Sequence, residues 1–233
     1  MVKERKKRWP ESEVELAAAV VEWLRFEQWE VYQEVQLSYG DAIADIVAVR
    51  EPVVWVIETK RSLSLEAIRQ AEDWHYHSHL ASVAIPIPRS TRRLAGERIC
   101  RLLGVGLLMV RPASAWEGAY ATEAVGSRFH RKALVKSLRG SLHEGHKTFA
   151  PAGNANGRRW SPWRETCDRF AKVVASRPGI GLKEAIESID HHYASEASAR
   201  SSMSLWLREG KIDGVRCEND GRRLRLFPVK ENE

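Results

Sequence analysis

The alternation of apolar and polar positions divides the first part of the chain into one helix and three strands. Residues 11–28 place apolar side chains three and four positions apart, which predicts a helix with one buried face. Residues 29–37 predict a first strand. Two almost wholly apolar runs, 42–49 and 53–60, lie on either side of a Glu-Pro turn, and we expect them to form a hairpin.

The same kind of pattern continues to about residue 110. After the hairpin we expect a helix, a buried strand, a second helix and a short strand, at residues 63–80, 82–88, 90–103 and 106–110. Helices and strands therefore alternate along this part of the chain, which favours an α/β domain.

Beyond about residue 140 the chain changes character. Residues 143–162 are rich in glycine, asparagine, proline and alanine and have no apolar period, which is typical of a linker. Residues 127–142, just before it, predict a basic helix. We therefore divide the chain into a first domain at residues 1–112, a basic helix and flexible linker at 113–161, and a second domain at 162–233.

The second domain is expected to be small and α+β. Three helices are followed by two short strands, at residues 162–176, 182–189, 196–209, 214–218 and 222–227. Ser195 caps the third helix and Gly210 ends it. An Asn-Asp-Gly sequence joins the two strands and favours a tight hairpin turn.

Composition favours a globular protein with a polyanionic partner and argues against several other classes of protein. With 233 residues and 43% hydrophobic content, the chain is long enough for one or two domains with real cores. Its net charge of +6 favours a polyanionic partner such as DNA. The three cysteines are far apart, which argues against a zinc ribbon and against a disulfide framework. The sequence has no apolar stretch of membrane-spanning length, no secretion signal and no phosphate-binding glycine loop, so we expect a cytoplasmic protein with no membrane partner and no nucleotide cofactor.

Three charged residues, Asp45, Glu58 and Lys60, interrupt the apolar runs of the predicted hairpin. If its turn is centred on Glu51-Pro52, the residue numbers of facing partners add up to 103, so Asp45 faces Glu58. Side chains alternate along a strand, so Lys60 lies on the same side as Glu58. The hairpin therefore predicts two carboxylates and an ammonium group in one small patch.

This patch favours a divalent cation. Two carboxylates this close repel each other, and partial burial makes both harder to ionise. A bound cation removes both penalties, and Mg²⁺ prefers one or two carboxylates together with water and phosphate oxygens. The alternative is an edge hairpin with its charges in solvent. Solvated faces alternate polar residues along their length, whereas these runs do not, so we favour the metal site.

The spacing Asp-x12-Glu-x-Lys on two adjacent strands resembles the PD-(D/E)XK nuclease superfamily, and the resemblance covers roughly the first 110 residues. The family's core runs helix, three strands, helix, strand, which is the order expected here. The resemblance implies a restriction-endonuclease-like mixed sheet flanked by helices. It also implies metal-dependent hydrolysis of DNA that leaves 5′-phosphate and 3′-hydroxyl ends. The combination of such a domain with the second domain favours a phage, mobile-element or host-defence setting.

Roles follow from the resemblance for the three motif residues. Asp45 and Glu58, with the carbonyl of Thr59, would hold Mg²⁺ or Mn²⁺. Lys60 would lower the pKa of the attacking water or stabilise charge on the phosphorane.

Family members often carry two supporting residues. The first is an acidic residue on the opening helix, for which we choose Glu15; the alternatives are Glu13, Glu22 and Glu34. The second is a glutamine in a Gln-x-x-x-Tyr pattern on the helix after the motif. Gln70 fits this pattern, but Trp74 stands where the tyrosine is expected, which keeps a ring one helical turn away and loses the hydroxyl.

Three helices and a hairpin in the second domain resemble a winged helix-turn-helix, a family that places its third helix in the major groove of DNA. The residues that would then meet DNA are Arg200, Ser201, Ser204 and Arg208 on the third helix and Arg222, Arg223 and Arg225 in the wing. Arg131 and Lys132 in the basic segment before the linker are further candidates.

Together these features predict a metal-dependent DNA endonuclease that a C-terminal winged helix targets to DNA. The alternative is a non-catalytic DNA-binding regulator or adaptor with a degenerate nuclease fold. A third hypothesis is structure-selective cutting, as in junction or flap processing, in place of cutting of ordinary duplex. A single site of this kind cuts one strand, so cutting both strands requires two copies or two binding events, and a homodimer would supply the two copies.

Overall fold

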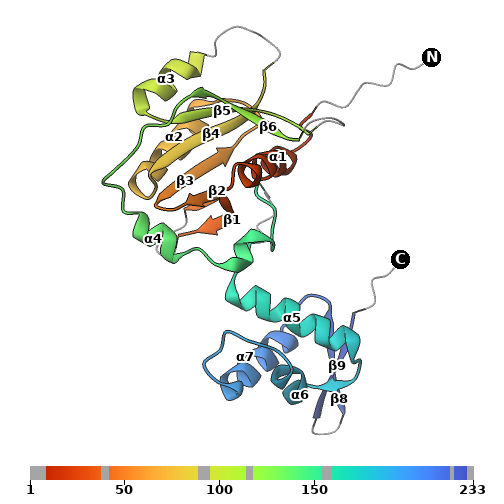
Figure 1. Cartoon of the computed structure of the whole chain (residues 1–233). Coiled ribbons are helices and arrows are strands. Elements are labelled where there is room, and N and C mark those ends of the chain that lie inside the picture. The colour runs from red at the N-terminus through yellow and green to blue at the C-terminus, as the bar shows by residue number, and fades with distance from the viewer. Residues whose placement is uncertain are drawn as a thin grey trace, which may run out of the picture. The chain divides into compact units, whose positions relative to one another are not determined.

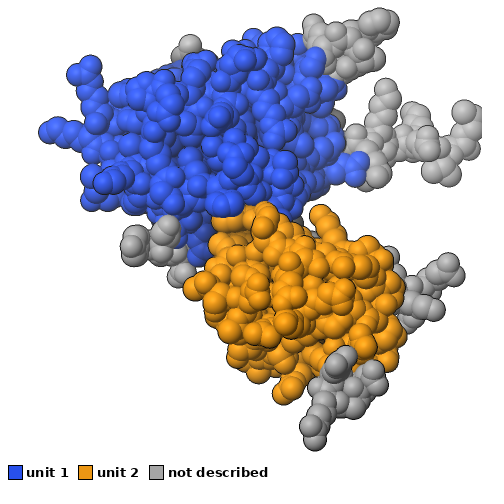
Figure 2. Space-filling model, turned by 60° about the horizontal axis from the view of Figure 1, so that its bottom comes forward, with its two compact units in different colours: residues 1–159 blue, residues 160–233 orange. Residues whose placement is uncertain are grey.

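The chain is described here from a computed structural model, which covers residues 9–37, 42–88, 95–113, 118–153, 159–220 and 223–229. It forms two compact units, residues 1–159 and 160–233, which Figure 2 shows in blue and orange. We describe each unit by itself. Within the described ranges, every helix is too short or too polar to cross a membrane.

The first unit is a six-stranded mixed sheet with helices on its faces (Figure 1). Its strands are β1 Glu30–Gln36, β2 Ile43–Arg50, β3 Val53–Thr59, β4 Leu80–Pro86, β5 Gly106–Arg111 and β6 Tyr120–Val125. They lie in the sheet in the order in which they occur along the chain. The pairs β1–β2, β2–β3 and β5–β6 are antiparallel, whereas β3–β4 and β4–β5 are parallel. The helix α2 Leu65–Asp73 and the helix α3 Ala95–Leu103 supply the crossovers that the two parallel pairs require.

Alternation along β2 and β3 sends successive side chains to opposite faces of the sheet. Ile46 and Ile57 pack with the helix α1 Glu13–Phe26, which covers one face. Val47 and Val56 pack on the other face, in a cluster with Trp74 and Leu138. Asp45 and Glu58 have the same parity as this second set, so the hairpin directs both carboxylates away from α1.

The helix α2 is shorter than the predicted helix at 63–80. Ser64 caps its start, because the Ser64 hydroxyl accepts a hydrogen bond from the N–H of Ala67. The helix ends at Asp73 and tightens into the 3₁₀ turn η1, Trp74–Tyr76. The chain then joins the sheet, because the N–H of His79 donates to the carbonyl of Val54 at 2.9 Å. Pairing with β3 therefore begins at Leu80, where we expected helix.

The described residues between 113 and 161 do not form the basic helix and linker that we expected; residues 114–117 and 154–158 of this segment lie outside the described part of the chain. Residues 120–125 form β6, which pairs with β5 and buries Ala121 and Val125. Only Val135–Gly140 is α-helical (α4), and its Leu138 is fully buried against the second face of the sheet. A 3₁₀ turn, η2, follows at Glu144–Lys147. These segments belong to the first unit because their apolar side chains complete its core. The sequence prediction missed this because basic residues outnumber the few apolar ones that are buried.

The second unit contains three helices and a three-stranded sheet. Its elements are α5 Pro162–Ser176, β7 Ile180–Gly181, α6 Leu182–Glu187, α7 Glu196–Arg208, β8 Val215–Asp220 and β9 Arg223–Pro228. The two-residue strand β7, which the sequence pattern did not predict, pairs with β9 and gives the sheet the order β7–β9–β8. The core forms around Phe170, Met203 and Leu226, which are fully buried.

Candidate functional site

The register of the β2–β3 hairpin is the one that the sequence predicted. Val49 pairs with Val54 and Ile46 with Ile57, so the residue numbers of partners add up to 103. At the next position the side chain of Asp45 reaches across to the end of β3. Its Oδ2 accepts hydrogen bonds from the backbone N–H of Thr59 at 2.8 Å and from the Thr59 hydroxyl at 2.9 Å. These two bonds fix one carboxylate oxygen beside Glu58.

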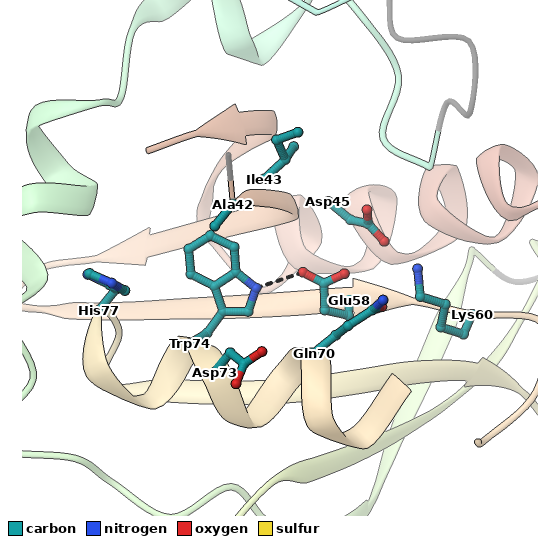
Figure 3. Close-up of a pocket in the computed structure, with 9 residues that line it drawn as sticks. All are labelled: Ala42, Ile43, Asp45, Glu58, Lys60, Gln70, Asp73, Trp74 and His77. Carbon is teal, nitrogen blue, oxygen red and sulfur yellow. Dashed lines mark hydrogen bonds between the residues drawn. The ribbon is translucent and has the colours of Figure 1, made fainter. Parts of the chain in front are cut away.

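Asp45, Glu58, Lys60 and Gln70 line one cavity of about 500 Å³. In Figure 3 the two carboxylates, the Lys60 amine and the Gln70 amide face a common space. Four of the predicted site residues, from three elements of the chain, thus come together. The remaining lining residues are Ala42, Ile43, Asp73, Trp74 and His77.

Glu58 is the most perturbed group in this cavity. Its side chain is only 4% exposed, and burial raises the pKa of its carboxyl to about 8, with repulsion from Asp45 as the second cause. The positive charge of Lys60 and a hydrogen bond from Trp74 act in the opposite direction and lower this pKa. The indole Nε1 of Trp74 donates to Oε1 of Glu58 at 2.8 Å, the dashed line in Figure 3. At neutral pH the carboxyl therefore keeps its proton unless a cation replaces that proton.

Lys60 lies just beyond β3 and is held at both ends. Its backbone N–H donates to the carbonyl of Ala84 on β4 at 3.0 Å. Its Nζ lies 4.0 Å from a carboxylate oxygen of Glu13, in the first turn of α1. Lys60 thus approaches a carboxylate of α1 and also lines the cavity of Asp45 and Glu58.

Our choice of Glu15 as the supporting helix acid does not fit this geometry. Its carboxylate accepts the N–H of Glu11 at 2.6 Å and so caps the start of α1 outside the cavity. The structure brings the alternative, Glu13, to Lys60 instead. Sequence alone could not separate the two, because both are in the first turn of the same helix.

The other two alternatives are engaged elsewhere. Glu22 accepts the N–H of Ala119 at 3.3 Å. Glu34 is buried on β1, with a φ of 52° in the left-handed region, and accepts the N–H of Gly153 at 2.8 Å. Its other carboxylate oxygen lies 3.8 Å from Nε of Arg159, so this acid faces Gly153 and Arg159 and not the cavity.

The helix α2 contributes more than its glutamine. Gln70 is half-buried, and its amide donates to Glu66 at 3.2 Å. Trp74, one turn later, packs on the sheet as we expected and also supplies the N–H that binds Glu58. The replacement of tyrosine by tryptophan loses a hydroxyl, but both side chains carry a donor, and this shared donor is the sequence feature from which the contact could have been predicted.

The residues present fit a hard divalent cation. In the described parts of the chain, His, Cys, Asp and Glu side chains form no group of three or more suited to a metal ion. Two carboxylates with backbone carbonyls and water are nevertheless a sufficient set for Mg²⁺, which keeps much of its hydration shell. The unfavourable burial of a carboxyl beside a second carboxylate is the feature that such an ion would relieve.

The predicted DNA-contacting residues of the second unit have mixed placements. Arg200, Ser201 and Arg208 are exposed on α7, and Ser204 is half-buried. Arg225 donates to the carbonyl of Gly179 at 3.1 Å, so it holds β9 to the loop between α5 and β7. Arg222 and the side chain of Arg223 lie outside the described residues.

Comparisons with known proteins give little further information. No protein-family model matches the chain, and no curated protein matches it. Among solved structures, the chain is similar to the SPO1766 protein of unknown function from Silicibacter pomeroyi, with 19% identity over 57% of this chain and 87% of that one. The TM-score of 0.36 is too low for this likeness to support an argument about fold or function.

Proposed function

We propose that this chain is a metal-dependent DNA endonuclease of the PD-(D/E)XK type. The observation that carries the proposal is the shared cavity of Asp45, Glu58 and Lys60, in which a buried carboxyl lies beside a second carboxylate and an ammonium group. Carboxyl groups whose pKa is strongly raised by burial and by a second carboxylate, and which line a cavity, are candidates for metal and catalytic sites.

The arrangement of the first unit supports this assignment. The order α1, β1, β2, β3, α2, β4 is the helix, three strands, helix, strand order that the resemblance implies. The mixed sheet, with its antiparallel hairpin followed by parallel pairs, brings the ends of β2 and β3 together with α2. A restriction-endonuclease-like fold is therefore the reading that we propose for this unit.

Asp45, Glu58, Lys60, Gln70 and Trp74 in the cavity, together with Glu13 beside it, have distinct parts in the proposed reaction. Asp45 and Glu58, with the carbonyl of Thr59, would hold Mg²⁺ or Mn²⁺, which supplies polarisation of the phosphate and activation of water. Lys60 would donate to the water or to the charged phosphate oxygens. Gln70 would orient the substrate or its water from the α2 side of the cavity. Trp74 and Glu13 are positioning residues, because they act through Glu58 and Lys60.

We propose further that the second unit is a winged helix that binds DNA. Three helices and a three-stranded sheet, with Arg200, Ser201 and Arg208 on the solvent side of α7, support this reading. The placement of Arg225 against Gly179 removes it from the list of contacts.

The test is cleavage of supercoiled plasmid with Mg²⁺ or Mn²⁺, by wild-type protein and by Asp45→Asn and Lys60→Met variants purified in the same way. Glu27→Gln, a change at an acid just after α1, is the matched control. Cleavage by wild type and control, without cleavage by the two site variants, supports the proposal. Equal cleavage by all four proteins would show that the site is wrong. DNA binding without any cleavage would favour the non-catalytic regulator. The ratio of nicked to linear plasmid in the product would show whether two copies act together.

A further inference from the structure

A second cavity lies on the other side of the turn η1. It measures about 490 Å³ and is lined by His75, Tyr76 and residues 129–133. Trp74 and His77, one 3₁₀ turn apart, line the first cavity, while the two residues between them line the second. The same turn therefore forms part of the wall of both cavities.

The second cavity is built on fixed backbone. The N–H of His130 donates to the carbonyl of His79 at 2.8 Å, and the N–H of Leu134 donates to the carbonyl of Tyr76 at 2.7 Å. The hydroxyl of Ser137 lies 3.1 Å from Nδ1 of His77. These contacts tie residues 130–137 to the turn that carries the first cavity's Trp74, so the two cavities keep their relation to each other.

Aromatic rings form an unusually large part of this surface. Tyr76 is 61% exposed and Phe129 is 48% exposed. The Phe129 ring stacks on His79, with ring centroids 5.1 Å apart, and His79 is fixed because its Nδ1 accepts the N–H of Val54. The rings of His75 and His130 stack with centroids 3.9 Å apart. Large rings that stay in solvent on a rigid support are suited to stacking against a further flat ring.

The charge of the surface comes from its edges. Burial lowers the pKa of His75 to about 4, and burial also lowers the pKa values of His79 and His130, so these rings are neutral at pH 7. Arg131 and Lys132, both exposed, lie in the lining. The segment at 127–140 contains five Lys or Arg and no Asp or Glu. The surface thus combines neutral aromatic faces with positive charge, which matches a flat base joined to a phosphate.

We propose that this second cavity binds an unpaired nucleobase of a single-stranded segment of nucleic acid. Tyr76 and Phe129 stack on the base, and Arg131 and Lys132 contact the adjoining phosphates. A further step rests on the proposed function. The two cavities share the turn η1, so a strand cut in the first cavity would have an unpaired base near the second. The preferred substrate is therefore a strand with an unpaired region, such as a flap or a frayed end.

The test measures binding and cleavage separately on the full chain. Binding is followed by fluorescence anisotropy in EDTA, with labelled strands on the order of 15 nucleotides long. The probes are single-stranded DNA, single-stranded RNA of the same sequence, a strand with abasic positions, and blunt duplex. The variants are Phe129→Ala and Lys132→Gln, and Phe26→Ala is the control because its ring is 79% exposed on α1, away from the lining of this cavity.

Phe129→Ala is expected to weaken binding of the normal single strand by roughly five- to 150-fold and to leave binding of the abasic strand unchanged. Lys132→Gln is expected to weaken binding of both the normal and the abasic strand, and to reduce the slope of log affinity against log salt concentration by about 0.7. Phe26→Ala should match wild type. Equal loss on normal and abasic strands, or no loss on either, would overturn the inference. The comparison of DNA with RNA shows which of the two sugars the site accepts.

The two proposals fail in different ways. If Phe129→Ala loses affinity in EDTA but wild type cuts no substrate with Mn²⁺, the base-binding cavity stands and the nuclease assignment fails. If wild type cuts and Asp45→Asn does not, while Phe129→Ala binds and cuts flapped and duplex DNA as wild type does, the nuclease assignment stands and the cavity inference fails.

Discussion

The indole nitrogen of Trp74 lies 2.8 Å from a carboxyl oxygen of Glu58, and both side chains are at least nine-tenths buried. A tryptophan N–H can only donate, so this contact favours the charged form of the carboxyl over the neutral form. Burial and repulsion from Asp45 raise the pKa of Glu58, and the tryptophan N–H lowers it. The tryptophan therefore makes the carboxyl easier to deprotonate at neutral pH.

Trp74→Phe removes this donor and should raise the pKa of Glu58 further. We expect the pH at which Mn²⁺ affinity is half-maximal to rise by about one to two units, because a hydrogen bond to a charged group is worth roughly 1.5–3 kcal/mol. Mn²⁺ titrations followed by electron paramagnetic resonance across pH 6–10 would measure this shift. The control is Trp55→Phe, which breaks a similar buried bond from Nε1 of Trp55 to the neutral Ser82 hydroxyl. The same shift in both variants would contradict the role that we give to Trp74.

The contribution of Glu58 to stability without metal should fall as the pH rises. The pKa of Glu58 is about 8 in the folded chain, against a usual value of 4.5, so the folded state binds more protons than the unfolded state between these values. Unfolding free energy therefore decreases with pH across this window, by on the order of a few kcal/mol for this group. Urea unfolding in EDTA at pH 5 and pH 8.5 measures the effect. The effect of Glu58 is the difference between wild type and Glu58→Gln, which has no proton to lose, because the lowered pKa of His75 gives an opposite trend below pH 6.5 in both proteins. A difference that does not change with pH would contradict the burial argument.

Divalent cations should reverse this loss. A cation that binds only the folded state stabilises it by about 2.7 kcal/mol at a concentration 100 times its Kd. We expect Mn²⁺ to raise the Tm of wild type at pH 8 and EDTA to restore the original value. Asp45→Asn should abolish the increase, because it removes one ligand of the pair. An equal increase in Tm for wild type and Asp45→Asn would place the cation elsewhere.

The two glutamates in the first turn of α1 should behave differently when neutralised. Glu13→Gln removes the carboxylate 4.0 Å from the Lys60 ammonium, so we expect the pH profile of cleavage to change with little effect on folding. Glu15→Met removes the acceptor of the Glu11 N–H at the start of the helix, so we expect a loss of roughly 0.5–1 kcal/mol in unfolding free energy and no change in the pH profile. Thermal unfolding and pH profiles of both variants distinguish the two roles, and the reverse pattern would restore Glu15 as the site acid.

Arginines of the second unit should separate into binding and structural residues. If α7 meets DNA as proposed, Arg200→Gln and Arg208→Gln, at two exposed arginines, should each weaken DNA binding and reduce the salt slope of the binding constant by about one. Arg225→Gln is expected to lower stability by about 1 kcal/mol through its lost bond to Gly179. Salt titrations of duplex binding and thermal unfolding of the three variants test this division. A normal salt slope in both α7 variants would argue that this helix does not meet DNA.

The hairpin was the part of the fold that the sequence predicted best, because its two apolar runs admit one register around a short turn. A slip of one residue would have sent Val47 and Val56 to the α1 face. The helix at 162–176 was also predicted to the residue, since Ser161 caps it and proline occupies its first position.

Other parts depended on contacts between distant segments. The end of α2 is set by His79 bonding to Val54, and β6 is set by pairing with β5, neither of which leaves a local periodic signal. In the site, the pair Asp45–Glu58 followed from register alone. The contact of Glu13 with Lys60 required the orientation of α1 on the sheet, which propensity and spacing do not determine.

The strand β6 has a practical consequence for anyone who shortens this protein. A fragment that stopped near residue 112 would strip the outer neighbour from β5 and leave a row of open N–H and C=O groups beside Leu108 and Val110. An unpaired strand edge promotes aggregation with other chains. Insolubility of that fragment would therefore not test whether the proposed site is catalytic. Cutting after residue 159, where the first unit ends, keeps that edge paired.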